Sequence, residues 1–120
     1  GNNKNILLIE PLPYYEFILT LRYCRIVLTD SGGIQEEAHT LGKPTLILRD
    51  ATERPEVLSE GNALLVGTDS KRIEREINDL LRSSKRFKSN KKNLNTFGDG
   101  NASKFILGKT IEFLNKKNIR

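Results

Sequence analysis

The stretch Arg25–Leu48, "RIVLTDSGGIQEEAHTLGKPTLIL", decides the fold. It opens with a short apolar run, passes through Asp30, Ser31 and two glycines into a helical pattern, and ends in a second apolar run after Gly42 and Pro44. Continuous apolar runs are typical of parallel strands that are buried on both faces. The stretch therefore predicts a strand, a helix closed by Gly42 and a neighbouring parallel strand.

The flanking sequence repeats this alternation. Apolar runs at Ile6–Ile9 and Ala63–Gly67 predict a first and a fourth strand. Helical spacing predicts helices over Tyr14–Tyr23, before Gly61, after a cap at Asp69 or Ser70, and from about Asn101 to Asn115. The third of these helices carries an apolar stripe made of Ile73, Ile77, Leu80 and Leu81. We predict an α/β fold, a Rossmann-like parallel sheet with helices on both faces.

Size and charge fit one globular domain. The 120 residues are 37% hydrophobic and 29% charged, and the net charge of +5 lies mostly in the second half. Few aromatic residues alternate with these basic residues, so we interpret them as a solvated helical face and tail and expect no nucleic-acid partner. We expect strands and helices over 5–84, a basic connection over 85–97 and a C-terminal helix over 98–116. The chain contains no methionine, which suggests a piece of a longer polypeptide.

Several site and location classes are disfavoured. No apolar run approaches the roughly 20 residues that span a bilayer, and the start is polar, so we expect a cytoplasmic protein with no membrane partner. A single cysteine and a single histidine exclude a Cys/His metal site. We expect no cofactor and a buried Cys24. The sequence offers no Ser/His/Asp or Cys/His set, so binding chemistry is present and bond-making chemistry is not evident.

The glycine turn is a candidate anion site. A helix that begins at Gly32 or Gly33 directs unpaired backbone N–H groups and the positive end of its dipole forward. Glycine lets a phosphate approach the backbone, and the Ser31 hydroxyl can cap the helix or bind the anion. The motif lacks the lysine of a P-loop and the third glycine of a dinucleotide fingerprint, so a plain capped turn remains an equal alternative.

Helical phase singles out Glu37 among the acids that follow. Glu37 falls on the same face as Ile34, Ala38 and Leu41, whereas Glu36 points the other way. A carboxylate on a packed face is costly unless satisfied, and here it could accept hydrogen bonds from ribose hydroxyls. A bond to a backbone amide or an arginine is the structural alternative. His39 lies off this face, and we interpret it as a surface residue.

The loop "RDATERPE", Arg49–Glu56, is the second candidate region. It follows a predicted strand, so it should lie at the same sheet edge as the glycine turn. Arg54 could bind a pyrophosphate with two parallel hydrogen bonds. The alternative is a loop held by internal ion pairs, such as Arg49 with Asp50 or Glu53.

These residues are recognisable together. "TDSGGIQEE", "LRDATERPE", "EGNALLVGTD" and "FGDGNASKFI" resemble the C-terminal part of the non-hydrolysing UDP-N-acetylglucosamine 2-epimerases, from about Ile9 to Leu107. The resemblance implies the partial second domain of a GT-B-type two-domain fold, with the N-terminal domain absent. Its usual strand order would leave Ile6–Ile9 without its neighbouring strands, and therefore unpaired or paired with another chain.

The resemblance also implies the site residues. Ser31, Gly32 and Gly33 would hold phosphate, Glu37 the ribose and Arg54 the diphosphate, and Phe17 would lie against the uracil. From its spacing alone Phe17 fits a core position equally well. Leu12 stands where some relatives have a glutamine that touches the base, and His39 where many have proline, a difference that we expect to be harmless on an exposed face.

The implied reaction interconverts UDP-GlcNAc and UDP-ManNAc by elimination and re-addition of UDP. Its acids and bases lie in segments outside this chain, so we predict that no catalytic residue is present and that the chain alone is inactive. The expected partners are the UDP-sugar, the missing N-terminal domain and, in the full-length protein, a second copy in a homodimer. A donor domain of a GT-B glycosyltransferase and a non-catalytic nucleotide-binding or oligomerisation module remain as alternatives.

Overall fold

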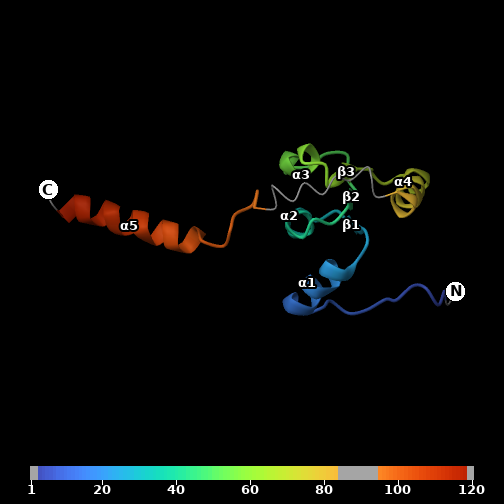
Figure 1. Ribbon diagram of the computed structural model, residues 1–120, viewed down its shortest axis with the longest axis horizontal. Helices are drawn as coiled ribbons and strands as arrows, with labels where there is room; N and C mark the ends of the chain where they lie inside the picture. Colours follow the sequence, from blue (N-terminus) through green and yellow to red (C-terminus); the bar gives the residue numbers. More distant parts are fainter. Residues whose placement is uncertain (1–2, 84–94, 119–120) are drawn as a thin grey trace.

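A computed structural model describes residues 3–83 and 95–118. The elements are three strands and five helices within these ranges, placed along the chain in the alternating order that the sequence predicts (Figure 1). Their bounds are α1 Tyr14–Tyr23, β1 Val27–Thr29, α2 Gly32–Thr40, β2 Thr45–Ile47, α3 Pro55–Ser59, β3 Ala63–Leu65, α4 Ser70–Arg82 and α5 Ala102–Asn118. Most of the predicted basic connection over 85–97 lies outside the described residues.

The three strands form one parallel sheet in the order β1-β2-β3. Leu28 pairs with Leu46, which in turn pairs with Leu64, so the three strands end at a common edge. Because the strands are parallel, the turn after β1 and the loop after β2 meet at that edge. The sheet thus brings together the two regions that the sequence marks as functional.

Helices cover both faces of the sheet, as predicted. On one face Leu21 of α1 and Ala38 of α2 pack with Val27 of β1. On the other face Leu80 of α4 packs with Leu46 of β2 and with Val66. The α/β class is therefore confirmed, and the core consists of two small apolar clusters separated by the sheet.

Helix ends follow their local sequence signals. Gly42 closes α2 with φ 66°, and its N–H donates to the His39 carbonyl over 2.8 Å. Of the two candidate caps for α4, Asp69 takes the role, because its Oδ1 accepts from the Arg72 N–H at 2.7 Å. In the predicted stripe of α4, Ile73 and Ile77 pack beside Leu80, but Leu81 was wrongly included, since it is 45% exposed on the solvent side.

The predicted first strand at Ile6–Ile9 does not form. This segment is extended outside the sheet, and its side chains are well exposed, with Leu8 at 93%. A strand of four residues gains its stability from ladder hydrogen bonds and buried side chains, and here it has no neighbour in the described chain. It is unpaired, the first of the outcomes that the strand order predicted.

Two further segments stand apart from the core. Every residue of α5 whose side chain is described is exposed, and the helix extends away from the sheet in Figure 1. Cys24, expected to be buried, is half-buried and donates its thiol to the Leu21 carbonyl over 3.1 Å. In the described part of the chain no helix combines the length and the apolar character needed to cross a membrane.

The central strand should dominate stability. Leu46 is fully buried between β1, β3 and α4, so Leu46→Ala removes packed methyl groups and leaves a cavity. We expect a loss of about 2–5 kcal/mol in the free energy of unfolding, measured by urea titration with circular dichroism. Leu8→Ala, at a 93% exposed position, is the matched control and should leave the midpoint unchanged. An equal loss of unfolding free energy in Leu46→Ala and Leu8→Ala would contradict the central place of Leu46 in the core.

Candidate functional site

The glycine turn joins β1 to α2 at the carboxyl edge of the sheet. Ser31 caps α2, since its Oγ accepts from the Ile34 N–H at 3.5 Å, and its own N–H donates to Thr29 Oγ1 over 3.0 Å. The first N–H groups of α2 begin at Gly32 and Gly33; Gly33 is exposed, whereas the side chains of Arg54 and Glu53 lie against Gly32. The turn is capped, as the plain alternative required, and the long Ser31 bond still leaves this helix start suited to an anion.

Arg54 lies directly against this turn. A Cβ placed on Gly32 would come within 2.6 Å of Arg54 Nη1 and 2.8 Å of Cζ. The missing side chain at Gly32 is therefore what gives the guanidinium its place beside the start of α2. The structure brings together the turn and the arginine that the sequence analysis proposed to share a diphosphate.

Ion pairs hold the loop that carries Arg54. Arg54 Nη1 lies 3.0 Å from Glu53 Oε1, and Arg49 Nη1 lies 3.3 Å from Glu53 Oε2. The Nε of Arg54 also donates to the Glu36 carboxylate, and this hydrogen bond is the main reason that the pKa of Arg54 is raised. The internal ion pairs of the alternative interpretation are thus present, with Glu36 as an additional partner.

Two buried polar residues that the sequence analysis missed position this loop. Gln35 is 1% exposed, and its Oε1 accepts from Thr52 Oγ1 at 2.7 Å. Thr52 Oγ1 in turn accepts from the backbone N–H of Arg54 at 3.2 Å. The chain Gln35, Thr52, Arg54 fastens the loop after β2 to α2. In the sequence, the one signal for the role of Gln35 in holding this loop is its place in the motif "TDSGGIQEE", directly after the glycine turn.

Glu37 lies in a small pocket between α1 and α2, of about 320 Å³. Its lining combines both acids of α2 with apolar and aromatic side chains, namely Tyr14, Ile18, Glu36, Glu37, Thr40, Leu41 and Phe97. Glu36 was predicted to point the other way, and this was wrong, because the reach of its side chain to Arg54 brings it to the same opening. Helical phase alone therefore does not separate the two acids.

Tyr14 is the partner of Glu37 in the described chain. The negative charge of Glu37 is the main cause that raises the pKa of the exposed Tyr14 hydroxyl, and loss of hydration and the hydrogen bond between the two groups act in the same direction. This contact occupies the carboxylate that the ribose hydroxyls were proposed to use. Phe17, one turn along α1, is half-buried against the cluster of Leu21, Val27 and Ala38, as its core interpretation required.

His39 is not a surface residue. It is 1% exposed, its Nε2 lies 2.8 Å from Glu60 Oε2, and its ring meets the Phe97 ring edge to face at 5.6 Å. The pair with Glu60 is close but poorly aligned for a hydrogen bond, and Nδ1 has no partner among the described residues. The prediction failed because α3 and the segment before α5 cover this flank of α2, and helical phase cannot show contacts so distant in sequence.

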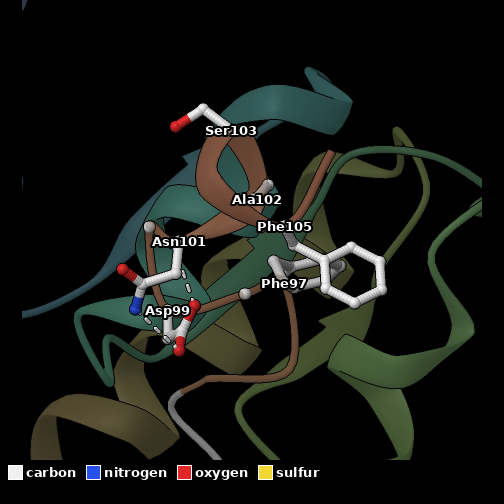
Figure 2. A pocket seen from close by; sticks show the side chains of 8 residues that line it. Phe97, Asp99, Asn101, Ala102, Ser103 and Phe105 are labelled. Atoms are coloured by element: carbon white, nitrogen blue, oxygen red, sulfur yellow. Dashed lines mark hydrogen bonds between the residues drawn. The ribbon is translucent and has the colours of Figure 1, made fainter. Parts of the chain in front are cut away.

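A larger pocket, of about 660 Å³, lies at the start of α5 (Figure 2). Its lining comes from the short range 97–105 and includes none of the proposed site residues. Asp99 accepts hydrogen bonds from the side chain and backbone of Asn101, and these bonds lower the pKa of Asp99. One chain segment lines this pocket, and Phe97 also lines the pocket of Glu37.

Together these features define a class of protein. A parallel sheet with helices on both faces, a glycine turn at its carboxyl edge and an arginine against that turn form part of a GT-B-type fold. The family model for UDP-N-acetylglucosamine 2-epimerase matches residues 1–110. The chain belongs to this family.

Individual relatives agree with this assignment. The chain is 46% identical to the Escherichia coli K12 UDP-N-acetylglucosamine 2-epimerase over 107 residues, which are 89% of this chain and 28% of that protein. It resembles Staphylococcus aureus MnaA in a UDP co-structure, with 36% identity and a TM-score of 0.85 over 96% of this chain and 31% of the other. The Neisseria meningitidis epimerase bound to UDP-GlcNAc gives 42% identity and a TM-score of 0.73 over 90% and 30%. The chain thus spans less than a third of these relatives.

The contact between Tyr14 and Glu37 can be tested by titration. Because a phenolate beside a carboxylate is disfavoured, Glu37→Gln should lower the pKa of Tyr14 toward its usual value of 10.0. The measurement is a pH titration of the Tyr14 ring carbons by NMR. Glu36→Gln is the matched control, since Glu36 pairs with Arg54, and should leave the Tyr14 titration in place. An unchanged Tyr14 pKa in Glu37→Gln would disprove the contact.

Proposed function

We propose that this chain is the UDP-binding portion of a UDP-N-acetylglucosamine 2-epimerase. The full-length protein would interconvert UDP-GlcNAc and UDP-ManNAc by eliminating UDP and adding it back to the opposite face of the sugar. The observation that carries the proposal is the approach of Arg54 to Gly32 at the start of α2, in a chain that belongs to this family. A helix start and an arginine on one side of it suit a diphosphate.

The charges of the site favour one orientation of the nucleotide. The diphosphate would lie at Ser31, Gly32 and Gly33, where it would meet the first N–H groups of α2 and Arg54 and would compete with the Glu53 carboxylate for the guanidinium. Glu37 would accept hydrogen bonds from the ribose, which requires Tyr14 to give up its contact. Phe17 is half-buried against the core cluster, and the exposed part of its ring would lie toward the uracil. The complexes of the N. meningitidis protein with UDP-GlcNAc and of the S. aureus protein with UDP support this ligand class.

This chain would bind UDP, the leaving group of the reaction, without supplying the groups that break its bond. In the part that the structure describes, the one histidine is buried against Glu60, Glu36 and Glu53 are paired with Arg54, and Glu37 lies against Tyr14. An N-terminal domain would then supply the acids and bases, and the full-length protein would act as a homodimer. A donor domain of a GT-B glycosyltransferase is less well supported, since the matched family is that of the epimerases.

Binding is tested by titrating UDP into the ¹⁵N-labelled chain. We expect amide shifts at Gly32, Gly33 and Glu37, and a loss of affinity of about tenfold to a hundredfold in Glu37→Gln, because one charged hydrogen bond contributes about 1.5–3 kcal/mol. Glu56→Gln, outside the proposed contacts, is the matched control. Absence of shifts at saturating UDP would favour a purely structural module.

Activity is tested on the same chain. We expect weak UDP binding and no conversion of UDP-GlcNAc to UDP-ManNAc, followed by NMR of the sugar anomeric proton over long incubation. The expectation rests on the lack of any proposed catalytic group in this chain. Measurable turnover by the 120 residues, lost again in Arg54→Ala, would place the chemistry here and overturn the proposal.

A further inference from the structure

Phe97 connects the end of the chain to the pocket of Glu37. It precedes α5, yet its ring lines the pocket between α1 and α2 together with Tyr14 and Glu37. The ring is fixed from the side by the edge-to-face contact with His39, with an angle of 87° between the ring planes. At 36% exposure, part of the ring remains open to a ligand.

Glu60 holds the segment around Phe97 in place. One of its carboxylate oxygens accepts from Thr96 Oγ1 at 2.7 Å, and the other lies 2.8 Å from Nε2 of the buried His39. Glu60 stands at the end of α3, so these contacts join α2, α3 and the segment before α5. Thr96 is thus held by Glu60 at the end of α3, and Phe97 by His39 of α2, with Glu60 and His39 themselves in contact.

The chemistry of the pocket selects which part of a nucleotide it receives. Glu36 and Glu37 both line its opening; Glu36 is paired with Arg54, so Glu37 is the acid whose charge would disfavour a phosphate inside the pocket. Ile18, Leu41 and Phe97 supply apolar and aromatic surface, which suits the face of a base or the carbons of a ribose. The pocket therefore fits the nucleoside, and the glycine turn with Arg54 fits the diphosphate.

We propose that Phe97 is a further specificity-determining residue, whose ring forms the wall of the nucleoside pocket opposite α1. His39, Glu60 and Thr96 are positioning residues that hold this ring beside Glu37. The inference rests on the proposed function, because it takes Glu37 as the ribose acceptor. It adds a contact from the segment before α5 to a site otherwise built by α1, α2 and the loop after β2.

The test compares UDP with inorganic pyrophosphate, which lacks the nucleoside. By NMR titration, Phe97→Ala should weaken UDP binding about fivefold or more, the usual effect of losing one stacking ring. The amide shifts that pyrophosphate causes at Gly32 and Gly33 should not change. If Phe97 had only a structural role, its loss would weaken the binding of both ligands. Phe97→Leu retains apolar volume but removes the aromatic ring, so it should also weaken UDP binding. It is the variant to use if Phe97→Ala unfolds.

Further variants distinguish the effect of the Phe97 ring from the effect of the contacts that position it. Phe113→Ala, at an exposed ring of α5 outside this pocket, should leave both ligands unaffected. Thr96→Val removes the hydrogen bond to Glu60 and should weaken UDP binding about twofold, because the segment that carries Phe97 is then less restrained. Thr96→Ser keeps the hydroxyl and should bind UDP as the wild-type chain does. If the wild-type chain binds UDP and both Phe97 variants bind it equally well, the role of Phe97 is disproved and the proposed function stands. If the wild-type chain shows no shifts at saturating UDP, both are overturned.

Discussion

The site depends on the close approach of Arg54 to Gly32. Any side chain at that glycine would occupy the space of the guanidinium, so the absence of one atom allows the loop after β2 to lie on the start of α2. The parallel pairing of β1 with β2 brings the two segments to one edge, and the bonds from Gln35 through Thr52 set their spacing. An anion placed here would meet backbone N–H groups and a guanidinium together.

Arg54 is already engaged before any ligand arrives. It contacts Glu36 and Glu53, and Arg49 shares Glu53. A guanidinium has five N–H donors, so a diphosphate can join this network or displace one carboxylate from it. The exposed pair between Arg49 and Glu53 contributes little to stability and can be rearranged at small cost. The network therefore pre-orients the arginine while leaving it available, whereas Glu37 must first lose its contact with Tyr14.

Local signals in the sequence were sufficient for the elements that form the site. Continuous apolar runs gave β1 and β2, Ser31 and Gly42 marked the ends of α2, and Arg54 followed from its place at a strand end. Contacts between distant segments were not predictable from these signals. His39 is buried because Glu60 and Phe97 cover it, and Glu36 reaches the site through the flexibility of a long side chain.

The Ile6–Ile9 segment failed as a strand for a related reason, since apolar composition predicts burial but cannot supply the neighbour that buries it. The same reasoning applies to α5. Its described side chains are exposed, and an isolated helix of 17 residues is only marginally stable in water. Among the described residues, two ion pairs lie within α5 and join Glu112 to Lys109 and Lys116; any further contact of α5 would add to its stability. Because α5 follows the segment that carries Phe97, such contacts would also restrict the position of that ring. The pocket of Glu37 is thus coupled by chain connectivity to whatever surface α5 meets, even though no residue of α5 lines it.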